Sequence, residues 1–83
     1  MVIQCGQSAR SLFPLPPDLN FCNHGSFGLT PKETLTQAAQ YREEIESNPV
    51  TGVYYDAQRR IRTAEKGIAD FLGSKPDNTV FVS

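Results

Sequence analysis

The sequence predicts an α/β fold. Two helix patterns, over about residues 31–47 and 52–72, precede a run of β-branched and aromatic residues at 79–83. Consecutive apolar residues without alternation are typical of a strand that is buried on both faces, usually in a parallel sheet. Because one strand cannot satisfy its own ladder hydrogen bonds, this pattern indicates the N-terminal piece of a larger α/β protein.

The N-terminal region, residues 1–20, is expected to form an extended arm. Prolines at 14, 16 and 17 exclude a helix over residues 12–17, since each lacks an N–H and pushes its predecessor toward extended geometry. Residues 1–6 have neither the basic start nor the apolar stretch of a signal peptide. The remaining residues, 21–83, are expected to comprise a helical segment and the first strand of a truncated domain.

The first helix is expected to begin at a capping box. Thr30 suits the N-cap, Pro31 suits the first helical position, and Glu33 follows three residues after Thr30. Asn48-Pro49 is expected to end this helix near residue 47. The predicted apolar face comprises Leu35, Ala38, Ala39, Arg42 and Ile45. Arg42 is interpreted as a side chain whose stem packs while its charged end reaches water.

The second helix is expected to end at Gly73, a residue suited to the left-handed conformation that terminates helices. Residues 74–78 are then expected to form a turn. The predicted apolar face comprises Tyr54, Ala57, Ile61, Ala64, Ile68 and Phe71. The residues predicted to face mostly toward solvent are Gln58, Arg59, Arg62, Glu65 and Lys66.

The overall composition is that of an ordinary water-soluble protein. The 83 residues carry a net charge of −1 and are 39% hydrophobic. The charge balance argues against a nucleic-acid partner, and no apolar run approaches the length of a membrane span. Two cysteines and one histidine cannot complete a zinc site. The expected location is the cytoplasm, with reduced thiols at Cys5 and Cys22.

The loop 23–28 has the most concentrated set of polar groups. It contains the single histidine, His24, and two of the six glycines, Gly25 and Gly28. The glycines permit positive φ or close backbone approach, and Asn23 and Ser26 can hydrogen-bond nearby backbone groups. The sequence does not complete a catalytic constellation, because His24 has no defined nucleophile or orienting partner. A loop or capping role for His24 therefore stays open beside a functional one.

The loop resembles the opening of class V aminotransferases, a family of pyridoxal-phosphate-dependent enzymes, in the branch of isopenicillin N epimerase-like and cysteine desulfurase-like members. The resemblance spans about residues 19–83. It is carried by Asn23-His24-Gly25-Ser26-Phe27-Gly28 before Pro31, by the joint Glu46-Ser47-Asn48-Pro49-Val50, by the helix end Ile68–Gly73, and by Thr79–Val82. Thr51-Gly52 departs from the basic and aromatic residues that relatives more often carry after Asn-Pro-Val, so the pocket shape and substrate are open.

The resemblance implies the N-terminal fragment of a fold type I enzyme, normally a homodimer acting on an amino acid. Such enzymes bind pyridoxal 5′-phosphate through a lysine that normally lies well beyond residue 83. The implied substrate-binding residues are Asn23, His24 and Gly25 at the mouth of the active site, with no catalytic, cofactor-binding or metal-binding residue in this chain. The fragment is expected to be inactive. The alternative is a stand-alone helical protein-interaction module without catalysis.

Overall fold

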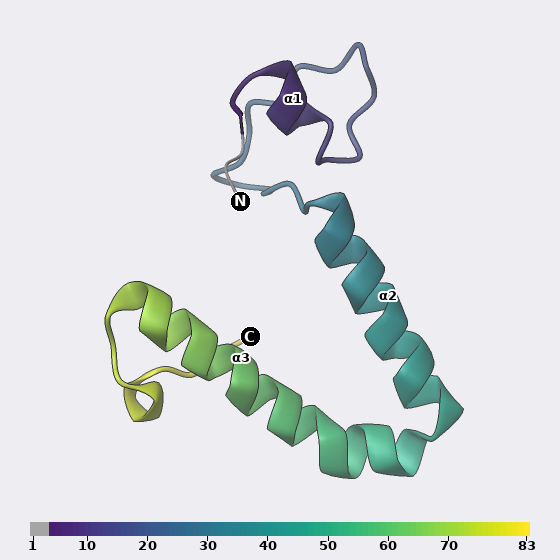
Figure 1. Cartoon of the computed structure of the whole chain (residues 1–83), viewed down its shortest axis with the longest axis vertical. Coiled ribbons are helices and arrows are strands. Elements are labelled where there is room, and N and C mark those ends of the chain that lie inside the picture. The colour runs from purple at the N-terminus through teal and green to yellow at the C-terminus, as the bar shows by residue number, and fades with distance from the viewer. Residues whose placement is uncertain (1–3) are drawn as a thin grey trace. The chain divides into compact units, whose positions relative to one another are not determined.

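The chain is helical, as Figure 1 shows, and the computed structural model describes residues 4–83. The chain divides into two compact units, Met1–Arg42 and Glu43–Ser83, and the boundary falls within the helix Lys32–Ser47. The first three residues of the expected arm lie outside the described residues. The elements, in order, are α1 (Gln7–Arg10), α2 (Lys32–Ser47), the π-helix η1 (Val50–Asp56), α3 (Ala57–Leu72) and the 3₁₀-helix η2 (Pro76–Asn78).

The predicted α/β class is wrong. The structure is 59% helical, and residues 4–83 contain no strand or sheet. Residues 79–83, the expected first strand, begin in an extended conformation at Thr79, with φ −127° and ψ 127°, and have no regular structure. Their β-branched and aromatic side chains favour extended backbone, but a strand also needs a neighbour for its ladder, and none lies among the described residues.

The N-terminal unit contains a loop that one arginine closes. The Arg10 guanidinium Nη2 donates hydrogen bonds to the carbonyl oxygens of Pro16 and Leu19, both at 2.6 Å, and approaches that of Pro17 at 3.3 Å. The backbone N–H of Lys32 donates to the Leu12 carbonyl oxygen at 2.8 Å. The expected extended arm therefore includes a helical turn and a closed loop, held by contacts that local sequence patterns do not reveal.

Both predicted helices are present. α2 ends at Ser47, directly before Asn48-Pro49. α3 ends at Gly73 in the predicted left-handed conformation, with φ 70° and ψ 24°. The Gly73 N–H donates to the Asp70 carbonyl oxygen at 3.2 Å, and the Ser74 N–H donates to that of Ala69 at 2.8 Å. These bonds satisfy carbonyl groups that the helix end leaves without intrahelical donors.

The first part of the second predicted helix is a π-helix that needs glycine at residue 52. The N–H groups of Thr51 and Gly52 donate to the Asn48 side-chain oxygen at 3.2 Å and its carbonyl oxygen at 2.8 Å. A Cβ atom added to Gly52 would lie 2.8 Å from the Ile45 Cα. Gly52 therefore allows η1 to approach the end of α2 more closely than any other residue type would.

The predicted apolar faces are largely exposed. Tyr54 is 75% exposed and Phe71 is 87% exposed, and α2 buries no residue. Within residues 4–83, the buried residues are Gly52, Glu65 and Ala69. Glu65, predicted to face solvent, is only 4% exposed. That prediction is wrong because periodicity alone cannot show which side of α3 the following residues cover.

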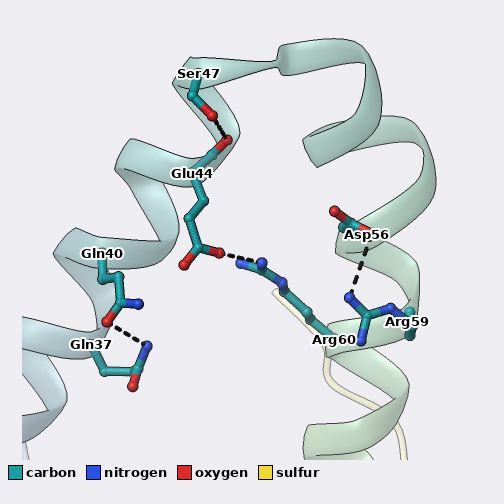
Figure 2. Close-up of polar contacts among 7 residues, drawn as sticks. All are labelled: Gln37, Gln40, Glu44, Ser47, Asp56, Arg59 and Arg60. Carbon is teal, nitrogen blue, oxygen red and sulfur yellow. Dashed lines mark hydrogen bonds and ion pairs between the residues drawn. The ribbon is translucent and has the colours of Figure 1, made fainter.

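Charged side chains join neighbouring helical segments in the C-terminal unit. Figure 2 shows Glu44, near the end of α2, paired with Arg60 of α3. It also shows Asp56 and Arg59, whose nearest charged atoms are 3.5 Å apart. Partly exposed pairs of this kind typically contribute about 0–1 kcal/mol to stability, so they orient the segments more than they stabilise them.

A helix that crosses a bilayer needs about 20 consecutive, mainly apolar residues. None of the helices in residues 4–83 combines the length and apolar character that this requires.

Candidate functional site

The predicted substrate-binding residues lie in an exposed loop of the N-terminal unit. Residues 23–28 form a turn before α2. The N–H groups of Ser26 and Phe27 donate to the carbonyl oxygen of Asn23, at 3.3 and 3.0 Å. The Asn23 backbone thus holds the turn, and its exposed side-chain amide makes no hydrogen bond with the described residues. That amide is available to a ligand.

His24 packs against an aromatic ring. Its imidazole meets the ring of Phe21 edge to face, with ring centroids 5.0 Å apart and planes at 81°. This arrangement is a favourable geometry for aromatic pairs. His24 remains exposed, and its ring nitrogens make no hydrogen bond within residues 4–83. Phe21 therefore restrains the ring while leaving the nitrogens accessible.

Gly25 does not use the positive φ that glycine permits, and nothing lies within 4 Å of the Cβ that a larger residue would add. Gly28 also avoids positive φ, and its added Cβ would lie 3.8 Å from the His24 carbonyl oxygen, an ordinary contact. The positive-φ glycines in the described residues are Gly6 and Gly73. Glycine pairs in loops suggest such conformations, but the actual φ depends on the turn formed.

The three lysines do not fit a covalent pyridoxal-phosphate site. Lys32 begins α2, Lys66 lies on α3, and Lys75 precedes η2; all three side chains are exposed, as expected from their positions. Lysines that form imines are typically set apart by burial. The described residues therefore do not supply the lysine that would hold this cofactor.

The two tyrosines and Arg59 at the start of the second helix have separate partners. The rings of Tyr54 and Tyr55 pack edge to face with centroids 4.9 Å apart. Arg59 pairs with Asp56 rather than with a tyrosine ring. The π-helix η1 therefore carries an exposed pair of tyrosine rings.

A shallow cavity of about 130 Å³ in the C-terminal unit was not predicted. It is lined by Arg62, Glu65, Lys66, Pro76 and Asp77. These residues come together because the chain turns back along α3 after Gly73. The sequence predicted that the helix ends at Gly73 and that residues 74–78 form a turn. It did not predict that the turn would direct the following residues back along α3.

The remaining polar side chains offer no metal centre. Residues 4–83 contain no group of three or more His, Cys, Asp or Glu side chains placed to hold a metal ion. The two thiols, Cys5 and Cys22, are free and exposed.

Comparison with protein-family models, curated proteins and solved structures gives no match to this chain. The resemblance to class V aminotransferases therefore rests on the residues and their order in the sequence.

Proposed function

We propose that this chain is the N-terminal portion of a cytoplasmic, homodimeric, pyridoxal-phosphate-dependent enzyme that acts on an amino acid. The reaction class is transamination, elimination, desulfuration or epimerisation. In this proposal Asn23, His24 and Gly25 contact the substrate at the mouth of the active site, and the cofactor lysine lies elsewhere in the enzyme. The 83 residues by themselves are inactive.

The observation that carries the proposal is the exposed loop at 23–28. Two polar side chains, Asn23 and His24, are next to each other there and make no hydrogen bond with the described residues. An amide offers donors and an acceptor, and a neutral imidazole offers one of each. Such groups suit the carboxylate and ammonium of an amino acid, and Gly25 adds no side chain that would obstruct it.

A second candidate is a stand-alone interaction module without catalysis. The exposed apolar side chains of the C-terminal unit favour it, since contiguous exposed apolar surface often marks a protein-binding site. The largest exposures on the predicted apolar face are those of Tyr54 and Phe71. The two candidates differ in whether the natural polypeptide contains a lysine that binds pyridoxal phosphate.

The test is a search for that lysine in the natural protein. An antibody against residues 51–73 would isolate the polypeptide from its source cells, with borohydride added to reduce any imine. Mass spectrometry is expected to find a polypeptide longer than 83 residues with one pyridoxyl-lysine at a position outside this sequence. Omitting borohydride is the control. A natural polypeptide of 83 residues with no pyridoxyl-lysine would reject the enzyme proposal and leave the interaction module.

A further inference from the structure

Glu65 is the one buried charged side chain among the described residues, and its carboxylate contacts the backbone of Phe81. It is 4% exposed although it comes from the predicted polar side of α3. Its carboxylate accepts a hydrogen bond from Arg62 Nη1 at 2.9 Å through Oε2. Through Oε1 it accepts one from the backbone N–H of Phe81 at 3.5 Å. Each carboxylate oxygen therefore has a donor, one local and one from residues 79–83.

We infer that Glu65 is a latch that holds the C-terminal strap, residues 79–83, against α3. Burying a carboxylate costs free energy unless its oxygens accept hydrogen bonds. The buried Glu65 carboxylate therefore needs the donor that the strap supplies, and the strap needs the acceptor that Glu65 supplies. The strap supplies the Phe81 N–H to the carboxylate. In return, Glu65 supplies an acceptor to a segment that has no ladder partner within residues 4–83.

The two valines of the strap contribute little to its position, because Val80 is 68% exposed and Val82 is 88% exposed. The middle of the strap is attached through Phe81, whose side chain is 53% exposed and whose backbone N–H contacts Glu65. At its start, the strap is guided by η2, which contacts α3.

Other charged side chains lie close to Glu65. Arg62 is paired with it, while Lys66 and Asp77 line the adjoining cavity. The Arg62 side chain is 70% exposed and the Glu65 side chain is 5% exposed, so Arg62 reaches the carboxylate from the solvent side. Removing the carboxylate would leave the Phe81 N–H without its acceptor.

The experiment measures solvent exchange of the Phe81 amide by NMR in the 83-residue chain, at a low temperature and protein concentration that precede the unfolding and association expected on heating. Glu65→Ala is expected to raise that rate roughly tenfold, because a net hydrogen bond contributes about as much as a tenfold change in an equilibrium. Glu65→Gln keeps an acceptor oxygen but loses the charge, and a smaller increase is expected. Glu43→Gln makes the same charge change at an exposed position of α2 and is the control.

Backbone chemical shifts of residues 57–72 would show in each variant that α3 is still formed. An unchanged Phe81 rate in Glu65→Ala, with α3 intact, would overturn the latch. The same increase in Glu43→Gln would also overturn it, because the effect would then follow net charge. If Glu65→Ala unfolds α3, the Glu65→Gln variant provides the test. Faster solvent exchange of the Phe81 amide in that variant supports the latch, and an unchanged exchange rate rejects it.

Discussion

Gly52→Ala is expected to loosen the junction between α2 and η1 strongly. The new Cβ would lie 2.8 Å from the Ile45 Cα and 3.2 Å from its Cβ, and a backbone neighbour cannot move aside as a flexible side chain can. Overpacking of this kind typically costs about 1–3 kcal/mol. The residue-52 amide donates to the Asn48 carbonyl oxygen. Its hydrogen should therefore exchange with solvent about 5- to 150-fold faster in the variant.

The matched control for this substitution is Gly67→Ala. Gly67 lies within α3, and nothing is within 4 Å of its added Cβ. Alanine there should stabilise the helix by about 0.5–1 kcal/mol, because glycine is a poor residue in a helix interior. An unchanged exchange rate at residue 52 in Gly52→Ala would contradict the proposed close approach.

His24→Ala in the intact enzyme is expected to raise KM for its amino-acid substrate by about tenfold with little change in kcat. A substrate hydrogen bond made equally in the ground and transition states would be lost, which changes binding and not the chemical step. Steady-state kinetics with the purified full-length enzyme provide the measurement. This prediction depends on the proposed function.

Ser26→Ala is the control in the same loop, since the turn uses the Ser26 backbone N–H and not its hydroxyl. It should leave both constants unchanged. If His24→Ala also leaves KM unchanged, the imidazole does not contact substrate, and its role is limited to packing on Phe21.

The helices were predictable because their signals are local. Asn48-Pro49 ends one helix and Gly73 ends the other, and each acts through the backbone of its own neighbours. The π-helix at 50–56 was not predictable, since its register depends on how closely residue 52 approaches Ile45. The strand prediction failed for a related reason: residues 79–83 have strand-forming side chains, but pairing requires a second strand.

The candidate site was predictable as a loop but not in its details. The turn follows from the polar and glycine residues at 23–28, as expected. Gly25 does not use the positive φ that glycine permits, because residue type alone does not determine φ. The burial of Glu65 was missed because its carboxylate contacts a residue, Phe81, that lies sixteen residues along the chain. Contacts at that separation depend on the direction of the turn at 74–78.

The proposed function implies that residues 4–83, which bury one hydrophobic residue, fold cooperatively only as part of a larger protein. Ala69 is the buried hydrophobic residue of the described chain, α2 buries none, and most helical stability in proteins comes from packing of an apolar face. The most direct test is thermal unfolding of the 83-residue chain, followed by far-UV circular dichroism and light scattering. A broad, non-cooperative loss of helix accompanied by association is predicted. One sharp two-state transition of a monodisperse monomer would contradict the claim and favour the stand-alone module.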